Sequence, residues 1–203
     1  MYQAEDRSSG RKTATIRRLV AALLVLWATA PMARELDLNL HNEAAEIGYY
    51  VQPEGETFTE DTDLGGSLYF NEGGDLILSG LFHALTPPVE GFSPWQLGGG
   101  LKGYAIQVDR PDETAGALAL SGSARVNIPA QLPQAVVLRA HVAPAITTIG
   151  GADRLFDGTV RYRVGLNPQV TGYLGYRYLQ LELDDGGDQS LEHNFHLGVS
   201  LRF

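Results

Sequence analysis

The chain has 203 residues, enough for one domain, or for one domain and a targeting segment. It contains no cysteine, which excludes disulfides, thiolate metal sites and cysteine nucleophiles. Residues 1–33 hold five of the fifteen basic side chains, so the remaining chain carries 10 basic against 22 acidic side chains, a charge of −12. Such a surface repels phosphate backbones, which excludes nucleic acid as a partner.

The N-terminal segment has the order of a secretory signal peptide. Arg17 and Arg18 end a basic region, an apolar run covers residues 19–30, and small residues follow. A membrane anchor is the alternative, but these twelve apolar residues fall short of the roughly 20 that a spanning helix needs. We therefore predict a cleaved signal peptide over residues 1–33, with cleavage after Ala33, and export through the inner membrane.

The mature chain begins with two short alternating segments. Apolar side chains alternate with others at residues 36–40 and again at residues 47–51, with a polar stretch between them. Both arms are shorter than the roughly 9 to 11 residues that a tilted membrane-spanning strand needs. We expect a short N-terminal hairpin that either joins a barrel wall, making ten strands, or caps it.

From Asp63 to the end, segments of about ten residues have the period of two expected of β-strands. In the last segment the alternation places Leu191, His193, Phe195, Leu197, Val199, Leu201 and Phe203 on one face. Seven connections separate eight such strands. Acidic, glycine-bearing connections, such as residues 71–75 and 184–188, alternate with proline-centred ones, such as residues 129–133. A meander whose two ends face different surroundings gives this alternation.

These features predict an all-β fold over residues 34–203, a small antiparallel up-and-down transmembrane β-barrel of eight full strands, or ten with the hairpin. Outer-membrane barrels have an even number of strands and point their apolar face to lipid. The terminal Phe203 resembles the signal read by the outer-membrane assembly machinery, which would place the proline side in the periplasm. Because periodicity alone does not separate a barrel from a sandwich, a soluble secreted β-sandwich binding module stays as an alternative.

Two glycine- and tyrosine-rich stretches resemble a known family. The segment 172–181 (GYLGYRYLQL), followed by an Asp/Gly loop and a last strand ending in Phe203, is similar to the YfaZ family of outer-membrane proteins, as is the stretch 98–104 (GGGLKGY). The resemblance implies a small, porin-like barrel of a Gram-negative outer membrane. It brings no established catalytic residues.

If the apolar face meets lipid, the other face points into the barrel. The predicted lumen-facing side chains are Lys102, Arg125, Arg139, His141, Asp157, Arg161, Arg163, Arg177, Asn194, His196 and Arg202. An eight-stranded barrel is just wide enough for side chains to fill it, which predicts a packed, ion-paired interior. A narrow anion-preferring channel for small solutes is the alternative, because the inward set has more basic than acidic members.

Three constellations were weighed as sites of chemistry. Ser79, His83 and Asp75 share a strand face, but residues four apart on a strand lie about 13 Å from each other, too far for a catalytic triad. His193 and His196 face opposite sides of their strand, so they do not share a metal ion. The acidic residues 184–188 lack the spacing of an EF-hand loop.

We therefore expect an integral outer-membrane protein of structural or surface-interaction type, with no enzyme activity, no cofactor and no metal. The expected partners are outer-membrane lipid and lipopolysaccharide and, during biogenesis, the barrel assembly machinery. We expect the protein to be a monomer.

Overall fold

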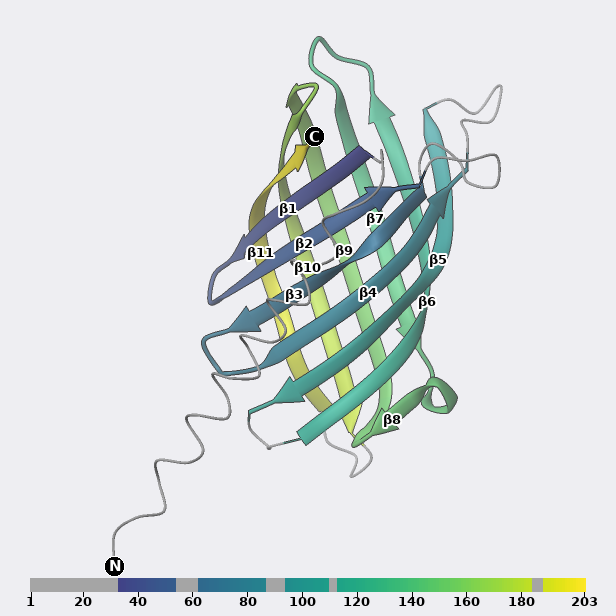
Figure 1. The fold of residues 1–203 in the computed structure, drawn as a ribbon, viewed down its shortest axis with the longest axis vertical. Coiled ribbons are helices and arrows are strands. Elements are labelled where there is room, and N and C mark those ends of the chain that lie inside the picture. The colour runs from purple at the N-terminus through teal and green to yellow at the C-terminus, as the bar shows by residue number, and fades with distance from the viewer. Residues whose placement is uncertain (1–32, 54–61, 87–93, 110–112, 184–187) are drawn as a thin grey trace, which may run out of the picture. The chain divides into compact units, whose positions relative to one another are not determined.

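The computed structural model describes residues 33–53, 62–86, 94–109, 113–183 and 188–203 (Figure 1). Ten long strands form its wall: β1 (Ala33–His41), β2 (Ala44–Gln52), β3 (Thr62–Asn71), β4 (Leu76–Leu85), β5 (Trp95–Val108), β6 (Glu113–Ile128), β7 (Gln134–Ala143), β9 (Ala152–Asn167), β10 (Val170–Leu183) and β11 (Asp188–Arg202). All neighbours pair antiparallel, and the ring closes because β1 pairs with β11 while β5 pairs with β6. A closed ring of this kind is a barrel and not a two-sheet sandwich.

The N-terminal hairpin is part of the wall. Its two strands have nine residues each, and β1 pairs along its length with β11, from Glu35 opposite Arg202 to His41 opposite His196. The barrel therefore has ten strands, the larger of the two predicted numbers. The apolar pattern underestimated both arms, because the strands continue through small and polar residues such as Ala44 and Ala45, and only Asn42 and Glu43 form the turn.

One strand of the wall is interrupted. β7 pairs with β6 between Leu120 and Ile128, and a three-residue strand, β8 (Thr148–Gly150), continues along β6 at residues 115–117. Between them lie Pro144 and a single 3₁₀ turn, η1 (Ala145–Thr147). Proline has no N–H to donate to a ladder, so the strand breaks there and resumes beyond the turn.

The last strand contains a β-bulge that the sequence pattern did not reveal. Leu179 pairs with Glu192 and Gln180 with Ser190, so Leu191 is the extra residue. Leu191 and Glu192 are both buried, whereas Phe195 is exposed. The prediction that Leu191 shares the face of Phe195 was therefore wrong, because a bulge reverses the alternation of side chains on the N-terminal side of the extra residue.

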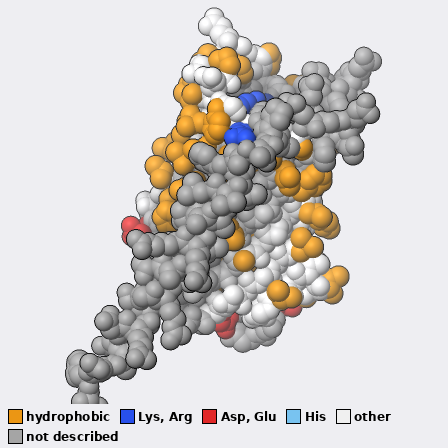
Figure 2. Space-filling model, viewed as in Figure 1, with side chains coloured by type: hydrophobic (Ala, Val, Ile, Leu, Met, Phe, Trp, Pro, Cys, Tyr) orange, Lys and Arg blue, Asp and Glu red, His pale blue; other side chains and the backbone are white. Residues whose placement is uncertain are grey.

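The outer face of the barrel is apolar. Large hydrophobic side chains from the strands of the wall are exposed, among them Leu40 (66%), Leu120 (68%) and Leu197 (62%). In the space-filling view such side chains lie along both edges of the barrel (Figure 2). Since the opposite face of each strand holds the polar residues, the wall is apolar outside and polar inside, as in membrane barrels.

The two ends of the barrel carry different connections. At the end where β11 finishes, here called the C-terminal end, lie residues 129–133 and the turn at Pro168. At the opposite, far end lie the acidic turn of residues 72–75 and the β8–β9 connection. In that acidic turn Gly74 has a φ of +92°, a conformation that favours glycine. Residues 129–133 and Pro168 thus lie at one end and the acidic turn 72–75 at the other, while Pro144, in the β7–β8 connection, also lies at the far end.

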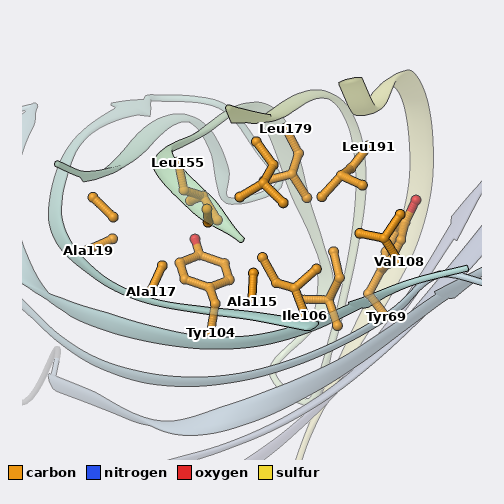
Figure 3. Packing of buried hydrophobic residues seen from close by; sticks show 14 residues of the cluster. Tyr69, Tyr104, Ile106, Val108, Ala115, Ala117, Ala119, Leu155, Leu179 and Leu191 are labelled. Carbon is orange, nitrogen blue, oxygen red and sulfur yellow. The ribbon is translucent and has the colours of Figure 1, made fainter. Parts of the chain in front are cut away.

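A hydrophobic cluster fills the interior at the far end. Its side chains come from β3 to β7 and from β9 to β11, and those of β9, β10 and β11 face those of β5 and β6 across the interior (Figure 3). The cluster consists of Tyr69, Ile77, Tyr104, Ile106, Val108, Ala115, Ala117, Ala119, Ala143, Ala152, Leu155, Leu179, Leu181 and Leu191. We call it the far-end cluster.

Candidate functional site

Five charged side chains meet inside the barrel next to the far-end cluster. They are Glu46, Lys102, Asp157, Arg177 and Glu192, each of them no more than 8% exposed. They come from β2, β5, β9, β10 and β11, so they join opposite walls of the barrel. We call them the ion-pair network.

Asp157 is the centre of this network. Its carboxylate accepts two hydrogen bonds from Arg177, at 3.0 and 2.9 Å, one from Lys102 at 3.0 Å and one from the Tyr104 hydroxyl at 2.8 Å. A carboxylate bonded in this way is satisfied without water, which is the condition for burying a charge.

Arg177 connects Asp157 to two further carboxylates. Its Nη1 donates to Glu46 at 3.2 Å and lies 3.6 Å from Glu192. Glu192 also pairs with the imidazole of His41, and Glu46 accepts a hydrogen bond from Ser67 at 2.5 Å. The network therefore binds β1, β2, β3, β5, β9, β10 and β11 together across the lumen.

On the C-terminal side of the network lies a cavity of about 70 Å³, room for a few water molecules. Its charged lining includes Arg139 on β7, Arg161 and Arg163 on β9, and Glu35, Asp37 and Asp63 on β1 and β3. We call it the arginine chamber. Lys102, Asp157 and Arg177 of the ion-pair network also line it.

Arginines and acids of the chamber differ in their bonding. Asp37 accepts hydrogen bonds from Tyr173 and from Ser200, both at 2.6 Å. By contrast, Arg161 has no carboxylate oxygen within 4.0 Å among the described residues, and its guanidinium lies 4.7 Å from the centre of the Tyr173 ring. The chamber therefore contains a half-buried cation that no described acid neutralises by direct contact.

A wider cavity of about 340 Å³ adjoins the chamber at the C-terminal end. Glu35 and Arg163 line both spaces, and Arg125 and Arg202 line the wider one. Arg202 donates to Glu35 at 3.2 Å. Within the described residues, the polar interior is thus open towards the C-terminal end and filled towards the far end.

The structure brings most of the sequence-predicted lumen residues into three groups. Lys102, Asp157 and Arg177 meet in the ion-pair network, while Arg139, Arg161 and Arg163 line the chamber. Arg125 and Arg202 lie beyond them in the wider cavity. His141 and His196 are buried and Asn194 is half-buried.

Sequence reasoning missed the acidic partners of these arginines. Glu35, Asp37, Glu46 and Asp63 belong to the N-terminal hairpin and β3, where the short arms gave no lumen assignment. The alternation of side chains along these strands could have identified the acids, because they occupy positions between apolar residues that point outwards. Glu192 was assigned to the polar face, but no pattern placed it against Arg177.

The other constellations are separate in space. Ser79 bonds to Ser67 at 2.8 Å, His83 to Ser123 at 3.0 Å, and Asp75 to Asn71 at 2.9 Å, so the strand-face trio forms no triad. His193 is exposed and His196 is buried, as expected for opposite faces. Residues 184–187 of the acidic loop lie outside the described residues.

In the described residues, the His, Asp and Glu side chains form no group of three or more that could hold a metal ion. In the same residues no helix is long and apolar enough to cross a membrane.

The fold can be set beside solved structures. The outer-membrane channel DcaP of Acinetobacter baumannii is 8% identical with a TM-score of 0.38, over 87% of this chain and 60% of that one, so the chain spans about 60% of DcaP. The NanC porin is 13% identical with a TM-score of 0.39, over 85% of this chain and 100% of that one. The translocator domain of the autotransporter NalP from Neisseria meningitidis is 12% identical with a TM-score of 0.26, over 98% of each chain.

A family model gives the assignment. No curated protein matches the chain. The model described as YfaZ precursor matches residues 13–203, which include every strand of the barrel. The chain has an outer-membrane barrel fold and belongs to the YfaZ family.

Proposed function

We propose that this protein is an integral outer-membrane barrel of structural or surface-interaction type whose lumen is closed to ions and solutes. The far-end cluster carries the proposal. Fourteen buried hydrophobic side chains fill one end of the interior, and Leu155, Leu179 and Leu181 among them are at most 1% exposed. We expect water and ions not to cross such packing, because packed protein interiors leave few voids larger than a water molecule.

The apolar outer wall supports a place in the membrane. Soluble monomers rarely expose a contiguous apolar patch above a few hundred Å², whereas here large exposed apolar side chains occur on the strands all round the ring. Closure of the ring also satisfies every strand edge, which a lipid environment requires. Family membership agrees with export to the outer membrane.

Export and partners complete the proposal. Residues 1–32 lie outside the described residues, and β1 begins at Ala33, so cleavage after Ala33 would leave the wall almost whole. The mature chain would reach the outer membrane with the barrel assembly machinery, contact lipid and lipopolysaccharide, and remain a monomer. The mass of the purified protein tests the cleavage site, since this site predicts a mature chain that starts at Arg34.

A narrow anion-preferring channel is the second candidate. Arg139, Arg161 and Arg163 on one wall of the chamber favour it. The ion-pair network and the far-end cluster oppose it, because both lie across the path from the chamber to the far end.

Two measurements test the proposed function. Membrane fractionation and a mobility shift on heating should identify a folded barrel, and recovery in the soluble periplasm without that shift would contradict membrane insertion. In planar bilayers the purified protein should show no steady conductance. A stable anion-selective open state that is lost in Arg161→Gln would replace the closed barrel with the channel.

A further inference from the structure

The side chains of the three arginines of the chamber donate no hydrogen bond within the described part of the chain. Arg139 lies 3.8 Å from Asp63 and Arg163 lies 3.6 Å from Glu35, and both distances exceed a hydrogen bond. The Nε atoms of Arg139 and Arg161 are buried without an acceptor among the described residues. Arg177, on the strand next to that of Arg161 and Arg163, donates three hydrogen bonds from its side chain.

Two acids of the chamber do not share this deficit. Asp37 accepts hydrogen bonds on both oxygens, from Tyr173 and Ser200, and Glu35 accepts one from Arg202. Each guanidinium has five N–H donors, and those of Arg139, Arg161 and Arg163 have no acceptor within hydrogen-bond distance among the described residues. Buried polar groups in proteins are nearly always bonded, and a cluster of exceptions points to a missing ligand or ion.

The shape of the space limits the ligand. A volume of about 70 Å³ has room for a few water molecules, since a water site needs roughly 10–15 Å³ of such space, and therefore for one small charged group. The adjoining cavity of about 340 Å³ has room for the remainder of a small molecule. Since the ion-pair network closes the chamber on its other side, a ligand enters and leaves through the C-terminal end.

The bonding of the lining groups selects the sign of the ligand. The lining is balanced in formal charge, with five carboxylates (Glu35, Asp37, Glu46, Asp63 and Asp157) against five bases (Lys102, Arg139, Arg161, Arg163 and Arg177). The carboxylates of Asp37, Glu46 and Asp157 accept hydrogen bonds from side chains of the barrel, whereas the guanidinium groups of Arg139, Arg161 and Arg163 donate none within the described residues. Planar guanidinium groups match the oxygens of carboxylates and phosphates in two-point contacts.

We propose that the arginine chamber binds a small oxyanion, a carboxylate or a phosphate, whose charged group contacts Arg139, Arg161 and Arg163. The proposal requires the barrel fold but does not depend on whether the barrel conducts.

Isothermal titration of the refolded, detergent-solubilised barrel tests it directly. Inorganic phosphate and succinate are titrated separately at constant ionic strength, with sodium chloride as the reference. Saturable binding of phosphate alone identifies a phosphate site, and binding of succinate alone identifies a carboxylate site. Either result, or both, supports an oxyanion site. Saturable binding of neither anion overturns the proposal.

Matched arginine variants locate the site. Arg161→Gln should weaken binding by about tenfold or more, as expected for the loss of a charge-assisted contact. Arg154→Gln is the control, because Arg154 lies on the same strand, near the far end, with a side chain 66% exposed. If Arg161→Gln does not fold, as judged by its mobility shift on heating, Arg163→Gln replaces it. Equal weakening of anion binding in Arg154→Gln would contradict binding in the arginine chamber.

The binding test addresses the oxyanion site and the conductance test addresses the closed lumen, so either claim can fail without the other. A barrel that conducts and also binds oxyanions refutes the closed lumen and keeps the site. A silent barrel that binds neither anion keeps the closed lumen and refutes the site.

Discussion

Arg177 donates two parallel hydrogen bonds to Asp157, from Nε to Oδ1 at 3.0 Å and from Nη2 to Oδ2 at 2.9 Å. The two residues lie on neighbouring strands, and through them Lys102 on β5 and Glu46 on β2 are joined across the lumen. This two-point contact makes Asp157 the acceptor on which both buried cations of the network depend.

Asp157→Asn should therefore destabilise the barrel strongly. The amide has no charge to balance Arg177 and Lys102, and breaking a buried pair in this way costs about 3–5 kcal/mol. Urea unfolding in lipid vesicles measures the change. Asp153→Asn is the control on the same strand, where a half-exposed carboxylate 3.8 Å from Arg154 should contribute about 0–1 kcal/mol. Equal effects of the two variants would contradict a bracing role for the network.

Gly198→Ala should impair folding through a clash with one named ring. A Cβ at this position would overlap the ring of Tyr173 on the neighbouring strand, whose hydroxyl is held by Asp37 at 2.6 Å. Overpacking of this kind costs about 1–3 kcal/mol. Gly103→Ala, where a Cβ meets nothing within 4 Å, is the matched control.

A double-mutant cycle separates the clash from other effects of Gly198→Ala. In a Tyr173→Ala background the ring is absent, so the glycine substitution should cost little in the free energy of unfolding. A cost that persists in this background would show that Gly198 matters for a reason other than the Tyr173 ring.

The sequence was sufficient for the class of fold because strand alternation is strong on the outer face. Each outward position meets the same apolar surroundings, so the period of two persists through β4, β6, β7 and β9. The interior has no such uniform environment. Glu46 and Arg177 are 131 residues apart in sequence and meet only because β1 and β11 close the ring. Register across that closure depends on pairing between distant strands, which local pattern does not encode.

One undecided alternative and one error have the same origin. The short apolar arms of the N-terminal hairpin did not indicate whether it joins the barrel wall or caps it. In the structure β1 belongs to the wall because it pairs with the edge of β11. The bulge at Leu191 arises where β10 and β11 shift register between Leu179 and Gln180. Both features depend on the partner strand, so the residues of a single strand do not predict them. The interior arginines, by contrast, were found from alternation alone.

Deletion of Phe203 should lower the amount of folded barrel in the membrane. Its backbone exchanges two hydrogen bonds with Arg34, at 3.0 and 2.9 Å, at the end of the β1–β11 pair that closes the ring. Loss of this contact, together with loss of the terminal aromatic side chain, should slow closure during assembly. The heat-modifiable fraction in isolated outer membranes measures the result.

The control for Phe203 is an exposed acid of the far-end turn, Glu72→Gln. The equivalent acid of the last loop, Asp185, lies outside the described residues. Equal membrane levels of the Phe203 deletion and the Glu72 variant would contradict a role of the terminal residue in assembly.

The far-end cluster predicts different costs for two leucines of the same strand. Leu179 is 0% exposed inside the barrel, while Leu174 is 49% exposed on the outer wall. Leu179→Ala should cost about 2–5 kcal/mol, because a cavity remains among rigid neighbours. At Leu174→Ala lipid tails fill the vacated space, so the cavity contribution is absent and the cost should be smaller. Urea unfolding of both variants in the same vesicles measures the difference. A cost at Leu174 equal to that at Leu179 would contradict a packed interior at the far end, and with it the closed lumen.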